Sequence, residues 1–188
     1  MTCRIDHIAI AAPSLEAGSD MLLRQLGVRP QAGGQHPRMG THNRLLRLGD
    51  SIYLEVIAID PSAAPPARAR WFGLDTRAAH AEPGLACWVA RTPDIRQSLA
   101  QAPEALGSAE PMSRGALEWL ISIPEDGSLP LDGVPPVLIE GRSPGHPAAG
   151  LQDQGCRLVG LELRHPEPDR VGALLRRLDV AEPGVALT

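Results

Sequence analysis

The chain has 188 residues, a formal net charge of −4 at pH 7, 43% hydrophobic residues and 21% charged residues. This composition is typical of a globular protein with a buried core and argues against a disordered chain. A nucleic-acid-binding protein needs a basic surface or aromatic stacking platforms, and the acidic balance and the 3% aromatic content argue against both. No run approaches the ~20 apolar residues of a membrane span, so we expect no membrane partner.

The three cysteines, Cys3, Cys87 and Cys156, are far apart and form no Cys-x-x-Cys pair. This spacing argues against a disulfide framework and against a structural zinc site. The start of the chain has no signal-peptide pattern, because its apolar run is short and amphipathic sequence follows at once. We therefore expect a cytoplasmic protein.

The apolar run at residues 4–12 predicts a first strand, in which side chains alternate between the two faces. His7 then shares a face with Ile5, Ala9 and Ala11. A histidine in this place is either a strand-end residue bonded to the backbone, or a ligand or proton carrier inside a sheet-lined cavity. The strand alone leaves both interpretations open.

The next segments predict a helix at residues 14–26, with Gly27 as its left-handed stop, and then a glycine-rich loop at residues 30–40. Residues 41–60 predict two strands that meet in a hairpin at Gly49. The pattern is typical of an α+β protein.

Residues 61–84 are rich in proline and alanine and have no clear period, which predicts a linker. Trp71 and Phe72 lie within it. The two aromatic side chains either form a lid over a pocket or pin the loop to the body of the domain.

The order of strand and helix then repeats. Residues 85–91 predict a strand, and Thr92 followed by Pro93 predicts the N-cap and first position of a helix. Pro13 and Pro93 are 80 positions apart, and the same offset carries His7 to Cys87. Such repeats indicate one supersecondary unit packed against its copy.

Further strands are predicted at residues 116–124 and 134–142, and a third start follows. It has a strand at residues 158–164 and a helix whose apolar stripe recurs at the spacing of one helix face. Its members are Val171, Leu174, Leu175 and Leu178.

These features resemble the vicinal oxygen chelate superfamily and, within it, the glyoxalase-like domain proteins. The segments that carry the resemblance are DHIAIAAPSLEAG, GGQHPRMGTHNRLLRLGDSIYLEVIAIDP, LACWVARTPDI and PPVLIEGRSPGHPA. The resemblance implies an α+β fold of paired βαβββ modules, of the glyoxalase/bleomycin-resistance/dioxygenase type, with a partial third module. We place the first module at residues 3–60, the linker at 61–84, the second module at 85–142 and the partial third module at 156–188.

The resemblance also implies a divalent metal held by the first and last strands of each module. The matching positions are His7, Glu55, Cys87 and Glu140. Cys87 departs from the pattern, since a histidine is expected there, so glyoxalase I activity is not expected and Cys87 is taken as a buried apolar residue. His7, Glu55 and Glu140 remain as expected ligands of Zn²⁺, Mn²⁺ or Fe²⁺.

A carboxylate inside an apolar strand needs a partner or water. Glu55 and Glu140 therefore either face a polar cavity or pair with arginines on a solvent face, the candidates being Arg44, Arg47 and Arg142. In a cavity, His7 beside Glu55 would form a carboxylate–imidazole pair that moves protons. We take His7 and Glu55 as catalytic residues.

The resemblance favours substrate contacts by His36 and Asn43, together with Glu140. The alternative is a loop whose glycines serve turns and whose Asn43 bonds to nearby backbone. Trp88 and Trp119 either line the pocket or fill the core, and we expect them in the core.

The expected function is that of an enzyme of lyase, isomerase or dioxygenase type acting on a small oxygen-rich substrate. The alternative is a metal-free protein that binds or sequesters a small molecule in the same cavity. The incomplete third module would leave a sheet edge open, which favours a homodimer.

Overall fold

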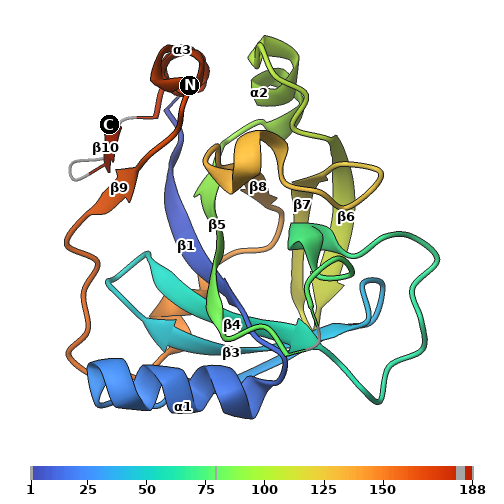
Figure 1. The fold of residues 1–188 in the computed structure, drawn as a ribbon, viewed down its shortest axis with the longest axis vertical. Helices are drawn as coiled ribbons and strands as arrows, with labels where there is room; N and C mark the ends of the chain where they lie inside the picture. Colours follow the sequence, from blue (N-terminus) through green and yellow to red (C-terminus); the bar gives the residue numbers. More distant parts are fainter. Residues whose placement is uncertain (1, 79, 181–184, 188) are drawn as a thin grey trace.

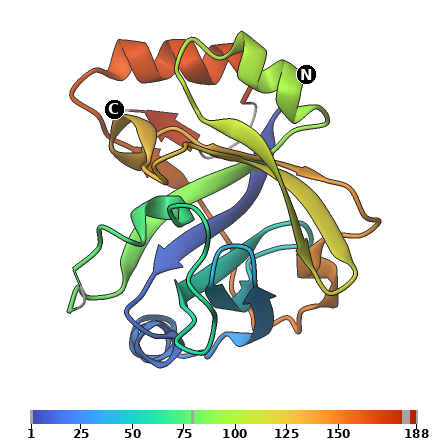
Figure 2. The same cartoon turned by 90° about the vertical axis from the view of Figure 1, so that its right-hand side faces the viewer.

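The computed structural model describes residues 2–78, 80–180 and 185–187. Its main feature is a mixed eight-stranded sheet of order β2-β3-β4-β1-β5-β8-β7-β6, curled into a half-barrel (Figure 1; Figure 2). The strands are β1 (Arg4–Ala11), β2 (Gln31–His36), β3 (Thr41–Arg47), β4 (Tyr53–Ile59), β5 (Gly84–Arg91), β6 (Ser108–Arg114), β7 (Leu117–Ile123) and β8 (Val137–Gly141).

Three helices and a small parallel sheet complete the described chain. The helices are α1 (Leu15–Leu26), α2 (Ile95–Gln101) and α3 (Pro168–Arg177), and the small sheet pairs β9 (Leu161–Leu163) with β10 (Val185–Leu187). Short 3-10 turns are η1 (Trp71–Gly73), η2 (Pro130–Gly133) and η3 (Pro147–Gly150). In the described residues, no helix is long and apolar enough to cross a membrane.

The two halves of the sheet have the same βαβββ order. In the first half β1 pairs in parallel with β4, and in the second half β5 pairs in parallel with β8. The halves join where β1 and β5 pair in an antiparallel ladder. This arrangement confirms the α+β fold class.

Helices cover the convex face, with α1 at one end of the molecule and α2 and α3 at the other (Figure 1). The Ser14 hydroxyl accepts a hydrogen bond from the Ala17 amide, and Gly27 ends α1 in the left-handed region at φ 73°. Leu22 of α1 packs with Val56 of β4, and burying such a side chain contributes about 2 kcal/mol. A separate cluster joins Trp88 and Leu174 under α2 and α3.

The two edge strands, β2 and β6, face each other across the open side of the half-barrel. The Arg38 guanidinium, just after β2, donates to the Pro111 carbonyl at 2.6 Å and pairs with the Glu110 carboxylate at 2.5 Å. We call this contact between β2 and β6 the seam. It closes the concave side with side chains, since no ladder of the described residues pairs β2 with β6.

Both edge strands differ from the sequence prediction. β2 occupies part of the segment predicted as a glycine-rich loop, and β6 was not predicted. β2 contains Gly33 and Gly34, and β6 contains Pro111, which edge strands tolerate because they need only one ladder.

Two boundaries also differ. The N-cap of α2 is Asp94, whose carboxylate accepts from the Gln97 amide at 2.9 Å, whereas the predicted cap, Thr92, bonds to the Ser98 hydroxyl. In the C-terminal region, β9 is shorter than the strand predicted at residues 158–164.

Candidate functional site

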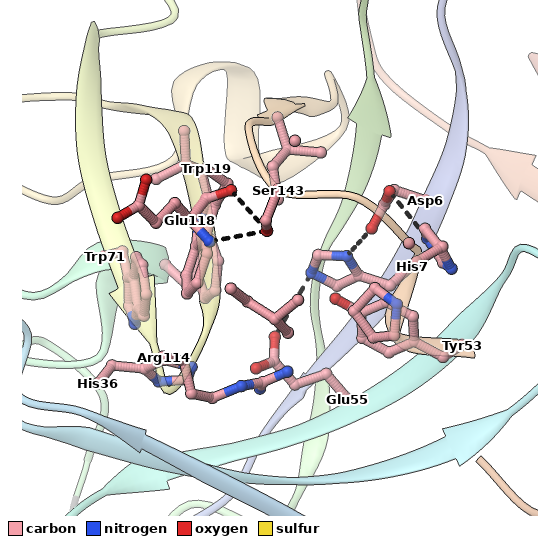
Figure 3. A pocket seen from close by; sticks show the side chains of 18 residues that line it. Asp6, His7, His36, Tyr53, Glu55, Trp71, Arg114, Glu118, Trp119 and Ser143 are labelled. Carbon is pink, nitrogen blue, oxygen red and sulfur yellow. Dashed lines mark hydrogen bonds and ion pairs between the residues drawn. The ribbon is translucent and has the colours of Figure 1, made fainter. Parts of the chain in front are cut away.

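A cavity lies on the concave face of the sheet, between the two halves. The empty space among its lining atoms is about 690 Å³, a volume that includes open solvent at the mouth. Figure 3 shows Asp6, His7 and Tyr53 on one wall and Trp71 and Trp119 on the other, with Glu55 and Arg114 at the floor. The cavity therefore contains acidic, basic and aromatic groups.

Two carboxylates hold His7 in the cavity wall. Its Nδ1 lies 2.8 Å from Asp6 Oδ1, and its Nε2 lies 3.5 Å from Glu55 Oε2. His7 and Glu55 are 3% and 5% exposed, so these contacts replace water. The Tyr53 ring stacks on the imidazole at 4.5 Å between centroids and fixes its plane.

Asp6 and His7 are consecutive residues, yet both line the cavity. In a regular strand they would face opposite sides of the sheet. The β1–β5 ladder has a register shift between Ile5 and His7, and this irregularity coincides with the turn of both side chains to one side. Strand alternation therefore could not identify Asp6.

The surrounding charges set the protonation of the pair. Burial alone would lower the pKa of His7, but the hydrogen bonds and charges of Asp6 and Glu55 outweigh it and raise that pKa to about 9. Burial alone would raise the pKa of Glu55, but His7 and Asn43 lower it to about 2. At neutral pH His7 is a cation that donates from both nitrogens, and Glu55 is a carboxylate.

Asn43 lies behind Glu55 and does not line the cavity. Its Nδ2 donates to Glu55 Oε1 at 2.5 Å, while its Oδ1 accepts from the Gly34 amide at 2.8 Å. The Gly34 amide fixes which way the side-chain amide points, and so it directs an N–H at Glu55. The structure thus brings Asn43 to the site as a residue that positions Glu55.

His36 does line the cavity, edge-on to Trp71 at 5.1 Å between centroids. Burial, and then the positive charge of Arg114, lower its pKa to about 4, so the ring is neutral at pH 7. Its Nδ1 bonds to the Thr41 hydroxyl at 3.0 Å, which leaves Nε2 to face the Asn43 amide. His36 is therefore a neutral polar group of the wall.

Glu140 points away from the cavity, which corrects the prediction that it contacts substrate or metal there. Its neighbours on β8, Ile139 and Gly141, line the cavity, so alternation turns Glu140 to the convex face. There it accepts from the Ile95 amide at the start of α2 at 3.0 Å and pairs with Arg142 at 3.0 Å. The alternative of an arginine partner holds for Glu140, whereas Glu55 pairs with His7.

The donors present do not fit the predicted metal site. Cys87 is buried in the apolar cluster of the concave face, where burial raises the pKa of its thiol well above the usual value. Both His7 nitrogens are engaged by carboxylates, so neither offers a lone pair. Among the described residues, no group of three His, Cys, Asp or Glu side chains could hold a metal ion.

His146, in the loop after the second half of the sheet, lines the cavity, and so does Tyr53, which was not predicted from the sequence. His146 accepts from the Ala148 amide at Nδ1, so its Nε2 carries the proton that it donates to Asp6 Oδ2 at 3.1 Å. Tyr53 is the one tyrosine of the chain and lies two positions before Glu55. Alternation along β4 would have placed Tyr53 and Glu55 on one face, so this signal was available.

Aromatic side chains form the wall opposite His7. Trp71 and Phe72, from the predicted linker, stack at 5.3 Å and are 3% and 7% exposed. Trp119 lies beside His36, lines the cavity and packs against the core cluster of the concave face, so it combines the two predicted alternatives. Trp88 is in the core as predicted and donates to the Val134 carbonyl.

Comparison with known proteins gives a family and a fold. The family model described as "Glyoxalase-like domain" matches residues 5–178. A hypothetical protein from Staphylococcus aureus is similar in structure, with a TM-score of 0.66 and 17% identity over 97% of this chain and 79% of that chain. At this identity the likeness is one of fold.

Two methylmalonyl-CoA epimerases are more weakly similar. A variant of the Streptomyces coelicolor enzyme, in complex with 2-nitronate-propionyl-CoA, has a TM-score of 0.49 and 18% identity, covering 76% of this chain and 98% of that chain. The protein from Mycobacterium tuberculosis has a TM-score of 0.44 and 16% identity, covering 74% and 88%. No curated protein matches this sequence.

Proposed function

Since the chain belongs to the glyoxalase-like domain family, as its resemblance to the vicinal oxygen chelate superfamily implied, we propose that its cavity is the active site of an enzyme that moves protons on a small oxygen-rich substrate. One observation carries this proposal. A buried carboxylate oxygen, Glu55 Oε2, lies 3.5 Å from His7 Nε2, and both residues line the cavity between the two halves of the sheet. A base and an acid side by side in a buried position are what proton transfer needs.

In the proposed reaction Glu55 takes a proton from a carbon next to a carbonyl group. The electron pair of the broken C–H bond moves into the carbonyl, and the His7 N–H stabilises the oxygen as its negative charge grows. Glu55 then returns the proton to carbon, at the same or at a different position. Such a cycle needs no oxidant and corresponds to an isomerase or to the first half of a lyase reaction.

Substrate binding itself would strengthen the base. The contact with His7 is a main cause of the low pKa of Glu55. A substrate oxygen that accepts the His7 N–H takes part of this interaction away from Glu55. The pKa of the carboxyl then rises toward the range in which it can accept a proton from carbon.

Deuterium exchange tests the proposal. The wild-type protein is incubated in D₂O with small α-hydroxyketones, 2-oxo acids and hydroxy acids, and loss of the carbon-bound proton is followed by NMR. We expect exchange in at least one compound and a loss of about 100-fold or more in Glu55→Gln, because that variant has no base.

The matched control is Glu140→Gln, which changes the same residue type on the convex face and should retain the exchange. Circular dichroism checks that each variant folds. No exchange with any compound, or equal rates in the wild type and Glu55→Gln, would contradict the proposal.

The alternative function is capture of a small molecule without chemistry. The wall of Trp71, Phe72 and Trp119 favours it, since aromatic side chains give a pocket large apolar contact area. In that case compounds would quench tryptophan fluorescence, but the wild type would incorporate no deuterium into any compound that binds.

A further inference from the structure

Arg114, at the end of β6, stands apart from the other basic residues of the chain. All 18 basic residues are arginines. Arg114 is half-buried and lines the cavity, yet its guanidinium makes no hydrogen bond and no ion pair within the described part of the chain. The other half-buried arginines all have hydrogen-bond partners, and they are Arg44, Arg47, Arg68, Arg70, Arg77 and Arg91.

A half-buried guanidinium without a partner is costly, because it has lost part of its water and gained nothing in return. Exposed arginines without a partner do not have this cost. Arg114 therefore has unused donors that face a cavity, which is the arrangement expected when the partner arrives with a ligand.

The stem of Arg114 is held by the seam. A Cβ atom at Gly34 would lie 2.6 Å from Arg114 Cδ and 2.9 Å from Cγ, so the side chain runs directly over the backbone of β2. Figure 3 shows it extending along the cavity floor from His36 toward Glu55. The guanidinium is thus directed at the same space as the proton-transfer pair before any ligand binds.

The charges in the cavity point to a singly charged ligand. Asp6, Glu55 and Glu118 are the acidic residues of the described lining. Asp6 and Glu55 engage His7, which leaves the guanidinium of Arg114 as a positive group that no carboxylate of this lining engages. A monoanion would be neutralised by Arg114 at the floor. A dianion such as a phosphate ester would bring a second negative charge close to Glu55 and Asp6, where repulsion disfavours it.

We infer that Arg114 binds the carboxylate of a small oxo or hydroxy acid and so places its reacting carbon beside His7 and Glu55. The planar guanidinium matches a carboxylate through two parallel hydrogen bonds, which fixes the orientation as well as the position of the ligand. This inference rests on the proposed function for the choice of an oxo or hydroxy acid. The recognition of a carboxylate rests on Arg114 alone.

Paired probes test the charge requirement. Pyruvate and lactate are titrated against the neutral analogues pyruvamide and lactamide, with binding followed by calorimetry and by the fluorescence of the cavity tryptophans. We expect each acid to bind the wild type about tenfold or more tightly than its amide. Arg114→Gln should remove this preference by weakening the acids and leaving the amides unchanged.

The control variant is Arg96→Gln, which removes an exposed arginine of α2 and should preserve the preference. Arg114→Lys keeps the positive charge but loses the planar pair of N–H donors. It should therefore bind the acids more tightly than Arg114→Gln and less tightly than the wild type. The comparison of acid with amide on the wild type needs no variant and stands even if Arg114→Gln does not fold.

The outcomes separate this inference from the proposed function. Equal binding of acid and amide, no binding of either acid at millimolar concentration, or inorganic phosphate binding as tightly as lactate would overturn the carboxylate site. Glu55→Gln should keep the preference for acids while losing deuterium exchange. If the preference holds but the wild type catalyses no exchange, the proton-transfer proposal fails and the carboxylate site remains.

Discussion

His7 is a cation between two carboxylates, and its charge links the stability of the fold to pH. The pKa of His7 is raised from 6.5 to about 9 on folding. A raised pKa means that the folded protein binds the proton more tightly than the unfolded chain does. The stabilisation is therefore complete below pH 6.5 and is lost as pH rises through about 9.

We expect the free energy of unfolding to fall on the order of 3 kcal/mol between pH 6.5 and 9 through this residue. Urea denaturation of the wild type and of His7→Gln across this range measures the effect. The variant should be less stable at pH 6.5, and its alkaline loss should be smaller. Parallel curves for the two proteins would show that His7 is not charged in the fold.

At acid pH, the stability of the fold depends on Glu55 and His36. The pKa of Glu55 is lowered from 4.5 to about 2, so its stabilisation is present above pH 4.5 and is lost as pH falls toward 2. The pKa of His36 is lowered from 6.5 to about 4, so the unfolded chain takes up that proton first, and stability falls as pH drops from 6.5 to about 4. The prediction for His7 is accordingly confined to the alkaline side.

The two glycines of strand β2 allow close packing and are not needed for turns. A Cβ atom at Gly33 would lie 2.1 Å from Asn43 Oδ1 and 2.7 Å from the Asn43 carbonyl oxygen. Neither Gly33 nor Gly34 has a positive φ. The glycines allow β2 to lie directly over Asn43, and through it β2 determines where Glu55 sits.

We expect Gly33→Ala to destabilise the fold by about 1–3 kcal/mol and to lower activity or ligand binding, since the added methyl displaces the amide that holds Glu55. Chemical denaturation and the deuterium exchange assay measure the two effects. Gly150→Ala is the control, because a Cβ there meets nothing within 4 Å. A neutral Gly33→Ala would show that Asn43 is not held by β2.

The sequence predicted those elements whose signals are local. The apolar runs of β1, β4 and β5 and the cap of α1 at Ser14 needed no knowledge of distant residues. β2 and β6 escaped prediction because an edge strand needs little apolar alternation. Arg114 could not be identified for the same reason, as it lies on β6.

Within the site, His7, Glu55 and His36 line the cavity, and their catalytic and binding roles stay predictions. Glu140 was misplaced because alternation tells which residues share a face but not which face is concave. Asp6 was missed because a bulge breaks the alternation. The curvature of the sheet and the irregularity in β1 both depend on how distant strands pair, which a local sequence pattern does not show.

At the scale of the whole molecule, both halves of the chain contribute residues to the cavity. The proton-transfer pair, His7 and Glu55, comes from the first half, whereas Arg114 and Trp119 come from the second. The division of the chain into modules at residues 61–84 and the homodimer stay predictions. Size-exclusion chromatography with light scattering checks the latter.

We expect Zn²⁺ and Mn²⁺ to leave the melting temperature unchanged at millimolar concentration, because Glu140 faces away and both nitrogens of His7 are engaged. A ligand that binds only the native state must raise its stability by mass action. Thermal scans of metal-stripped protein measure this. A rise that disappears in His7→Ala would show that the cavity rearranges to hold a metal after all.

The seam between β2 and β6 is a late contact in folding, and the half-barrel is complete only when it has formed. Arg38 and Glu110 are 72 positions apart, so their contact can form only after each half has assembled its own strands. Until then β2 and β6 are edge strands with unpaired backbone N–H and C=O groups, which can pair with another chain. While the seam is open, the cavity is incomplete and the edges of β2 and β6 are exposed to other chains. A bound ligand that keeps the seam closed would therefore also reduce aggregation.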